Sequence, residues 1–472
     1  MTHSQEPLES LSTGLFVRSL AIMRLAVAAS GEFSIFKTSN DQEESDEQRA
    51  KTLKHLEEQA HEISHELGKL KGSVMKVGQL LSMYGEHFLP PQVNAILKTL
   101  QASSPPLAWE AIAPVLKKEL GANLEELEVD AKAIAAASIG QVHAARIKST
   151  NQTIALKIQY PGVDRAIQSD LRALRGLAAF APLAAPALVR GPRLAEFICE
   201  IEEMLAKEVD YRSEADCSEK FAELLAGDSR YVIPKIHRHW SSSKVLATDK
   251  ICGHRFDAEA LQKLPPERRN ALAESLIDLY LRELFEFGCV QTDPHVGNYL
   301  VRLQGEFTCD GQLIENDAIV LFDFGAVRKL DPHFIQNYRT LVEASLFKNK
   351  EAVSDAALEL KFLLPCDPPA VHDAFYDFCR LVVEPFDPSG ADDNGRTFFD
   401  SEDRYDWSRS DLPTRLRKRL VDVIRARELR VPPREAIFID RKSSGLYVLL
   451  GLLGAKTRGR ERLSRTLQAA IR

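Results

Sequence analysis

Three polar side chains at fixed spacing constrain this chain more than any other feature. Asp293 stands five residues before Asn298 in Asp-Pro-His-Val-Gly-Asn, and a second aspartate follows in Asp323-Phe324-Gly325, directly after the apolar run 318–322. The residues between the two segments suit a β-hairpin. Carboxylate and amide oxygens are the ligands that Mg²⁺ takes when it bridges phosphates. The pattern therefore predicts a phosphoryl-transfer site, with Asp293 as catalytic carboxylate and Asn298 and Asp323 as metal ligands.

A lysine in the strand-like segment "IALKI" fits the same chemistry. Alternation puts Ile154, Leu156 and Ile158 on the core face of this strand and Ala155 and Lys157 on the other face. We therefore expect Ala155 to border an adenine and Lys157 to reach phosphate. A lone strand lysine usually extends to water instead, and only the aspartates downstream favour the functional interpretation.

Such a lysine needs a carboxylate partner, and the charged segment 193–226, predicted to be one long helix, offers two. Glu208 shares an apolar stripe with Ile201 and Leu205, so it would be buried and would need a cation. Glu214 lies on another face of the same predicted helix. The pairing of Lys157 with Glu208 or with Glu214 stays open from sequence alone.

The order of patterns predicts four segments. Residues 1–44 form an N-terminal extension, partly disordered, which runs into the acidic linker 39–49. Residues 45–110 form a helical module, 111–253 a small mixed lobe and 254–472 a larger helical lobe, which is an α+β fold. The helical module rests on an apolar seam at steps of three and four, at Leu53, Leu56, Ala60, Ile63, Leu67, Leu70, Val74, Val77 and Leu81.

Composition narrows the class of protein. A chain of 472 residues with 44% hydrophobic residues, 27% charged residues and a net charge of −7 is ordinary for a globular enzyme and argues against nucleic acid as a partner. The seven cysteines lack CxxC or Cys/His spacing, so we expect neither a disulfide framework nor a zinc site, and a reducing compartment. They stand at positions 199, 217, 252, 289, 309, 366 and 379.

Two apolar stretches raise the question of a membrane. Residues 15–31 are interrupted by Arg18 and Arg24, and residues 445–455 are much shorter than the roughly 20 residues that a spanning helix needs. The polar N-terminus lacks the features of a secretory signal or a transit peptide. We expect both stretches to be helices packed in a core, no transmembrane segment, a cytoplasmic location, and only peripheral contact with a membrane if the protein meets lipid.

Six short motifs follow one another in a fixed order. They are "KVGQ" at 76–79, "AAASIGQVH" at 135–143, "IALK" at 154–157, "EVDYRSEA" at 208–215, "DPHVGN" at 293–298 and "DFG" at 323–325. This set resembles the UbiB-type atypical kinases, also called the AarF-domain or ABC1-like family. The resemblance runs from about residue 45 to residue 455, and it implies a protein-kinase-like bilobal fold with an added helical module, and binding of ATP and Mg²⁺.

The resemblance also implies roles for further residues. Ala135, Ala136, Ala137 and Ser138 stand where a typical kinase has its glycine-rich loop, and the Cβ atoms of the alanines should hold the backbone away from phosphate. Lys76, Gly78 and Gln79 take the place of the family's Lys-x-Gly-Gln helix, which covers the cleft. That implies a gating role for these three residues and for Asp210.

Four residues depart from the family pattern. Gln291 and Thr292 replace the usual His and Ala before the aspartate, Val296 replaces a proline, and Tyr299 replaces a smaller aliphatic residue. The predicted metal ligands are intact, so these departures should alter the stiffness of the loop.

The resemblance implies a kinase-like ATPase that supports ubiquinone (coenzyme Q) or related isoprenoid-lipid biosynthesis. Its partners would be an isoprenoid lipid, a quinone precursor or proteins of that pathway. Two alternatives are a kinase acting on a small molecule or lipid, and a nucleotide-sensing scaffold of a biosynthetic complex. The sequence does not indicate an oligomeric state.

Overall fold

The computed structural model describes residues 106–137, 139–169, 209–390, 395–426 and 433–468, with a few isolated positions between 171 and 206. The chain divides into two compact units. The described part of the first unit ends at Asp216 and also takes in Lys235–Lys250, and the second unit comprises Cys217–Pro234 and the chain from Ile251 onward. The chain passes from one unit to the other within helix α8, Tyr211–Leu224.

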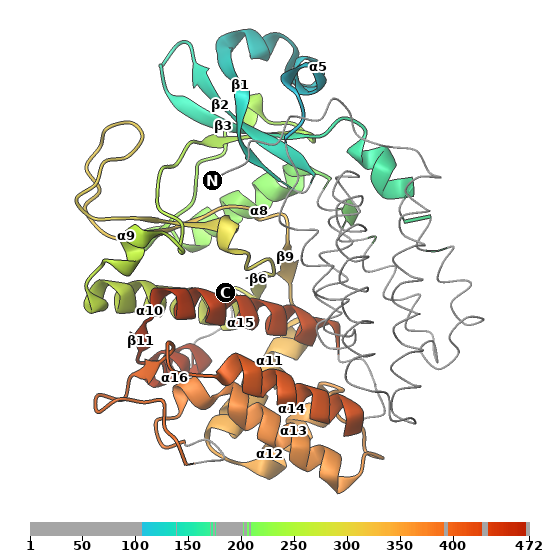
Figure 1. The fold of residues 1–472 in the computed structure, drawn as a ribbon. Coiled ribbons are helices and arrows are strands. Elements are labelled where there is room, and N and C mark those ends of the chain that lie inside the picture. The colour runs from blue at the N-terminus through green and yellow to red at the C-terminus, as the bar shows by residue number, and fades with distance from the viewer. Residues whose placement is uncertain are drawn as a thin grey trace, which may run out of the picture. The chain divides into compact units, whose positions relative to one another are not determined.

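The first unit is built on an antiparallel sheet in the order β1-β2-β3-β5 (Figure 1). Ile154, Leu156 and Ile158 of β3 are fully buried, which confirms the predicted alternation. Helix α5 supplies Ile112 and Leu116 to the same core. The elements are α5 Trp109–Leu120, η1 Gly121–Glu126, β1 Leu127–Ala136, β2 Gly140–Ile147, β3 Thr153–Gln159, η2 Arg238–Trp240 and β5 Val245–Asp249.

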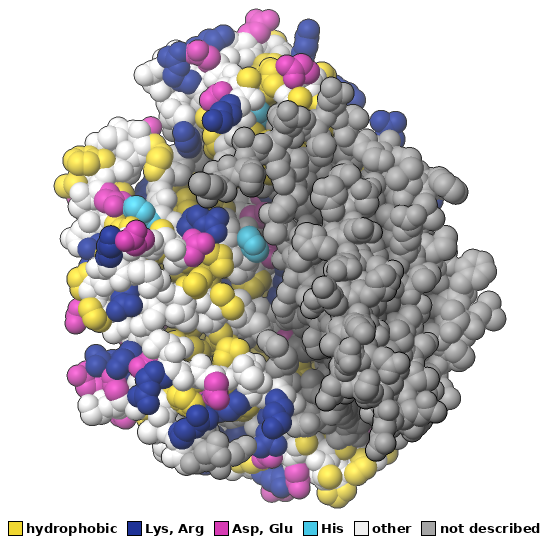
Figure 2. Space-filling view, in the orientation of Figure 1, with side chains coloured by type: hydrophobic (Ala, Val, Ile, Leu, Met, Phe, Trp, Pro, Cys, Tyr) yellow, Lys and Arg dark blue, Asp and Glu magenta, His cyan; other side chains and the backbone are white. Residues whose placement is uncertain are grey.

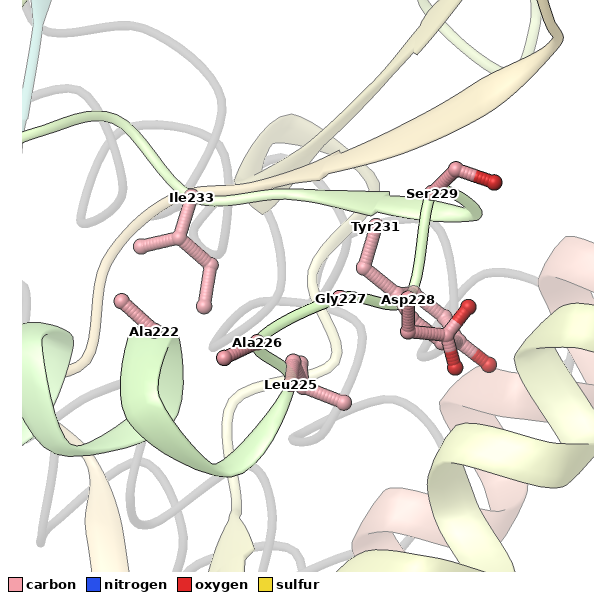
Figure 3. Close-up of a pocket in the computed structure, with 8 residues that line it drawn as sticks. All are labelled: Ala222, Leu225, Ala226, Gly227, Asp228, Ser229, Tyr231 and Ile233. Atoms are coloured by element: carbon pink, nitrogen blue, oxygen red, sulfur yellow. The ribbon is translucent and has the colours of Figure 1, made fainter.

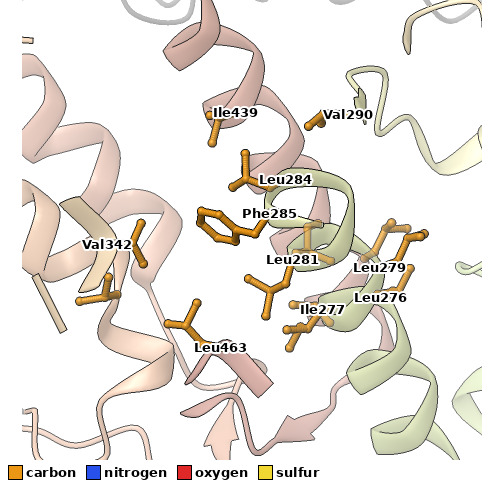
Figure 4. Packing of buried hydrophobic residues seen from close by; sticks show 14 of the residues in the cluster. Leu276, Ile277, Leu279, Leu281, Leu284, Phe285, Val290, Val342, Ile439 and Leu463 are labelled. Atoms are coloured by element: carbon orange, nitrogen blue, oxygen red, sulfur yellow. The ribbon is translucent and has the colours of Figure 1, made fainter. Parts of the chain in front are cut away.

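The second unit is mainly helical. Helix α10, Pro266–Phe285, lies beside α15, Arg434–Leu453 (Figure 1). Leu281, Leu284 and Phe285 of α10 belong to one core cluster with residues of α11, α15 and α16 (Figure 4). The remaining helical elements are α9 Glu259–Gln262, η3 Val296–Asn298, α11 Pro332–Leu346, α12 Lys350–Glu359, α13 Pro369–Val382, η4 Glu384–Phe386, α14 Leu412–Ala426 and α16 Arg460–Gln468.

Short strands in the second unit carry the predicted motifs. β7, Tyr299–Arg302, and β8, Ala318–Leu321, pair as the antiparallel hairpin expected between the two aspartate segments. β4, Tyr231–Val232, pairs with β8 in parallel. β6, Cys289–Gln291, pairs with β9, Val327–Lys329. β10, Tyr405–Asp406, pairs with β11, Lys456–Thr457.

The single helix predicted over 193–226 is wrong, because α8 begins only at Tyr211. Asp210 is not helical, and its Oδ1 accepts a hydrogen bond from the Arg212 amide at 3.1 Å, while its carbonyl accepts from Ser213 at 3.1 Å. An aspartate in this role caps the start of a helix and so separates it from the preceding turn. The predicted stripe through Glu208 assumed a continuous helix across this break.

The cysteine spacing, which suggested no disulfide framework, did not predict the one disulfide seen among the described residues. Cys252 and Cys309 form it, with their Cα atoms 5.6 Å apart. Cys309 lies in the tip between β7 and β8, and the disulfide ties this tip to the segment that precedes α9. The backbone of His254 bridges Val301 in the same region, which brings the two segments together.

The apolar segment 445–455 is packed in the core, as expected. Leu446, Leu449, Leu450 and Leu453 of α15 are each at most 5% exposed. In the part of the chain that the structure describes, no helix is long and apolar enough to cross a membrane. Basic and acidic side chains are interspersed over the coloured part of the face shown in Figure 2.

Candidate active site

Lys157 of β3 forms an ion pair with Glu214 of α8. Nζ lies 2.8 Å from Oε1 and 2.9 Å from Oε2 of the carboxylate. The two side chains are 17% and 6% exposed, so the pair is largely shielded from water. The ring of Tyr211 lies 5.0 Å from Nζ and adds a cation–π contact. All three groups belong to the first unit, and Glu208, the other predicted partner, lies outside the described residues.

Three residues of the motif "GQVH" in β2 stabilise the fold of the first unit through close packing and buried hydrogen bonds. A Cβ on Gly140 would lie 2.4 Å from the carbonyl oxygen of Ile158, so only glycine fits there. Gln141 is buried and exchanges hydrogen bonds with the backbone of Leu107 at 2.7 and 3.1 Å. His143 is buried, with Nδ1 2.8 Å from the carbonyl oxygen of Asp130, and burial lowers its pKa.

The alanines that stand in place of a glycine-rich loop lie at the end of a strand and at the turn after it. Ala135 and Ala136 pair with Val142 and Gln141 at the end of β1 and are exposed. The turn begins at Ala137, whose amide donates to the Gly140 carbonyl at 2.8 Å. Ser138 lies outside the described residues. Ala155 keeps its predicted place on the face of β3 that carries Lys157.

In the second unit, Asn298 directly precedes β7 and Asp323 follows shortly after β8, so both residues lie at the open end of the β7–β8 hairpin. The side-chain nitrogen Nδ2 of Asn298 donates a hydrogen bond to the Asp293 carbonyl at 2.9 Å. The side-chain oxygen Oδ1 is therefore the Asn298 atom that would coordinate a cation. The Asn298 carbonyl accepts from Phe322 at 3.0 Å and so ties this loop to the residue before Asp323. The hairpin thus holds the predicted ligands near one another.

Asp323 has a strained backbone, with φ of +52°. Non-glycine residues adopt this region only rarely, although aspartate does so more readily than most, and such residues cluster at active sites. Its Oδ1 accepts from the Gly325 amide at 3.2 Å. Phe324 is buried and packs on Phe221, with ring centroids 4.9 Å apart. The Asp-Phe-Gly segment is therefore anchored through its phenylalanine, and its aspartate is held in a defined conformation.

Two of the residues that depart from the family pattern support these loops. The side-chain amide of Gln291 donates to the Asp293 carbonyl at 2.9 Å and to the Asp323 carbonyl at 3.2 Å. Thr292 is buried, and its hydroxyl donates to the Ala326 carbonyl at 2.8 Å. From the sequence, we expected these positions to alter the stiffness of the loop, but the sequence did not predict these hydrogen bonds.

Sequence reasoning missed two neighbouring cations on α15. Arg441 donates from Nη2 to Oδ1 of Asp293 at 2.6 Å. Lys442 forms a buried ion pair with Glu283 of α10 at 3.0 Å. Burial alone would lower the pKa of Lys442, but the charges of Glu283 and Tyr299 and the hydrogen bonds to them together outweigh burial, and the pKa is raised. The available signal was the Arg441-Lys442 pair shortly before the apolar stretch 445–455.

None of the predicted site residues lines a surface pocket of about 370 Å³ in the second unit (Figure 3). Asp228, the acidic residue that lines this pocket, forms ion pairs with Arg230 and Arg282. It is lined by Ala222, Leu225, Ala226, Gly227, Asp228, Ser229, Tyr231 and Ile233.

Comparison with known proteins identifies the family of this chain. A family model described as the ABC1 atypical kinase-like domain matches residues 99–357. The chain belongs to this family. The kinase-like α+β fold inferred from the sequence is thereby confirmed.

Several curated relatives of this ABC1-family chain are named as atypical kinases. The rat protein named atypical kinase COQ8B, mitochondrial, is 30% identical over 84% of this chain and 70% of its own length. The Saccharomyces cerevisiae protein named atypical kinase COQ8, mitochondrial, is 30% identical over 83% and 73%. The Schizosaccharomyces pombe COQ8 protein is 31% identical over 86% of this chain, which spans only 62% of that relative.

A solved structure supports the same fold for this ABC1-family chain. It is a complex of Rv3197 with erythromycin, from Mycobacterium tuberculosis. It aligns with a TM-score of 0.57 and 25% identity over 89% of this chain and 98% of that one.

The structure does not test the predicted gating role of four residues. Lys76, Gly78 and Gln79 lie outside the described residues, and Asp210 is seen as the N-terminal cap of α8. Their role in gating stays a prediction, as do the boundaries of the four predicted segments.

Proposed function

We propose that this protein is a kinase-like ATPase that binds Mg–ATP and supports ubiquinone or related isoprenoid-lipid biosynthesis. The observation that carries the proposal is the bidentate pair of Lys157 with Glu214, since a strand lysine held by a helix glutamate is the arrangement that kinases use to orient ATP phosphates. The pathway assignment rests on the COQ8 names of the relatives.

The roles of the residues follow from their chemistry. Lys157 binds a phosphate oxygen, and Glu214 holds the ammonium group in place. Asp293 orients the attacking oxygen and accepts its proton, as a carboxylate can.

The residues of the hairpin fit a bound Mg²⁺. Asp323 offers a carboxylate in a fixed, strained conformation, and Asn298 offers Oδ1. Mg²⁺ prefers oxygen ligands of this kind together with phosphate oxygens. When bound, the ion neutralises charge that develops on the phosphoryl oxygens.

Two measurements test the proposal. Purified protein with γ-labelled ATP should release labelled phosphate in a Mg²⁺-dependent reaction. Transfer of the label to an isoprenoid extract would instead favour the lipid-kinase alternative.

The second measurement is the isoprenoid quinone profile of cells that lack the protein, rescued with wild type or Asp293→Asn. Wild type should restore the quinones and the variant should not. Unchanged quinones in the deleted cells would remove the pathway assignment, and full rescue by the variant would favour the scaffold.

A further inference from the structure

Helix α15 supplies a cation to the proposed catalytic carboxylate. Nη2 of Arg441 lies 2.6 Å from Oδ1 of Asp293, which makes this a short charge-assisted hydrogen bond. The two side chains are only 17% and 18% exposed. A shielded pair of this kind is screened by solvent far less than a surface salt bridge.

The neighbouring residue fixes the helix that carries Arg441. Lys442 is 5% exposed and pairs with Glu283, which is 2% exposed. Its Nζ also lies 3.3 Å from the hydroxyl of Tyr299 in β7. Two charges this deeply buried must stay together, so the pair sets the rotation and the height of α15 against α10.

The same buried pair reaches the backbone of the proposed catalytic loop. Oε2 of Glu283 accepts from the Gln291 amide at 3.2 Å. Gln291 in turn donates to the carbonyls of Asp293 and Asp323, so it links both proposed catalytic positions. The carboxylate that Arg441 contacts and the helix that presents Arg441 are therefore tied to one buried network.

We propose that Arg441 is a positioning residue for phosphoryl transfer, which holds the Asp293 carboxylate in one orientation, and that the buried Lys442–Glu283 pair holds Arg441 at that place. This inference rests on the proposed ATPase function. It concerns the catalytic step and not nucleotide binding, because the contact of Arg441 is with the carboxylate.

The test compares Arg441→Gln, Arg441→Lys and the matched control Arg255→Gln. Arg255 also pairs with an aspartate, Asp257, but its side chain is 61% exposed and lies outside the site. Turnover of ATP, the dissociation constant for Mg–ATP and the melting temperature are measured for each protein. A positioning role predicts that Arg441→Gln lowers kcat about tenfold to a hundredfold, while affinity for Mg–ATP changes by less than about twofold.

Conservative replacement and chemical rescue separate positioning from simple structural support. Arg441→Lys should keep an intermediate kcat, because an ammonium supplies the charge without the planar geometry of a guanidinium. Added ethylguanidinium should restore part of the kcat of Arg441→Ala, whereas a variant that is merely misfolded would not respond.

The outcomes distinguish this inference from the proposed function. If wild type neither binds nor hydrolyses Mg–ATP, the proposed function fails. If wild type is active and Arg441→Gln matches Arg255→Gln in kcat, only the role of Arg441 is overturned. A rise in kcat would likewise overturn it, since it would show that Arg441 restrains Asp293 in an inactive state.

Discussion

Nζ of Lys157 lies within 2.9 Å of both carboxylate oxygens of Glu214, in a pair that is largely shielded from water. Because Glu214 follows the capped start of α8 by three residues, its position depends on where that helix begins. The helix cap at Asp210 and the ion pair with Lys157 therefore both fix the position of the Glu214 side chain.

Replacing Lys157 with methionine should weaken binding of ATP. A hydrogen bond to a charged group contributes about 1.5–3 kcal/mol, which corresponds to roughly a tenfold to 150-fold loss of affinity. Lys148→Met is the matched control, since Lys148 is an exposed lysine just beyond β2. Nucleotide titration measures both variants, and equal dissociation constants would contradict a role for Lys157 at phosphate.

Replacing Asp323 and replacing Asp293 should have different effects on Mg–ATP binding and on hydrolysis. A ligand at 100 times its dissociation constant stabilises the folded state by about 2.7 kcal/mol, so Mg–ATP should raise the wild-type melting temperature. Asp323→Asn removes a charged metal ligand and should lose most of the Mg²⁺-dependent part of that shift. Asp293→Asn should keep the shift and lose hydrolysis. An unchanged shift in Asp323→Asn would refute its assignment as a metal ligand.

His143 should make stability depend on pH. Its Nδ1 lies 2.8 Å from the Asp130 carbonyl oxygen, and its Nε2 lies 2.8 Å from the Gln141 amide nitrogen. The second contact needs an unprotonated Nε2, because that amide nitrogen is a donor. The structure therefore favours the neutral ring.

Burial lowers the pKa of His143 in the folded state, so the unfolded chain binds the proton first as the pH falls. The contribution of this residue to stability is complete above its unfolded pKa of about 6.5 and is lost as the pH falls through the folded pKa. Thermal unfolding at about pH 7.5 and about pH 5.5 should show a smaller loss for His143→Gln than for wild type. Equal losses in the two proteins would show that His143 does not contribute.

Reduction of the disulfide should destabilise the second unit. Cys252 and Cys309 are 57 residues apart, and loop-closure entropy for such a span gives an upper value of about 4 kcal/mol. A reductant should lower the unfolding midpoint of wild type and leave that of Cys309→Ser unchanged. Cys366→Ser, at an exposed cysteine outside the disulfide, should respond to reductant as wild type does.

Local periodicity explains which parts of the site were predictable. The alternation of β3 placed Lys157 and Ala155 on one face, and the hairpin between Asn298 and Asp323 followed from two short apolar runs. Each of these inferences uses residues that are close in sequence. Strand period and turn chemistry act over that range.

The partners of the cations on α15 could not be predicted in this way. Arg441 and Asp293 are 148 residues apart, and Lys442 and Glu283 are 159 residues apart. Tertiary packing alone sets such contacts. The pairing of cysteines has the same limit, since spacing does not determine connectivity. The choice between Glu208 and Glu214 depended on the helix boundary at Asp210, and boundaries are the least reliable part of a pattern.

The last prediction concerns the contact of α15 with the residue after Asp293. A Cβ on Gly445 would lie 2.2 Å from Cγ and 2.3 Å from Cβ of Pro294. The proline ring is rigid and cannot turn aside, so Gly445→Ala should push the helix and the loop apart. Because Arg441 lies one helical turn before Gly445, the same movement should separate Arg441 from Asp293.

Gly451→Ala on the same helix is the matched control, because a Cβ there meets nothing within 4 Å. Replacing an exposed helical glycine with alanine should stabilise the protein by about 0.4–1 kcal/mol. Gly445→Ala should instead lower the melting temperature and reduce ATP turnover by about tenfold or more, since small misplacements of catalytic groups are costly. Melting temperature and kcat are measured for both variants. If Gly445→Ala keeps the wild-type kcat, the close contact of α15 with Pro294 is not needed to position Asp293.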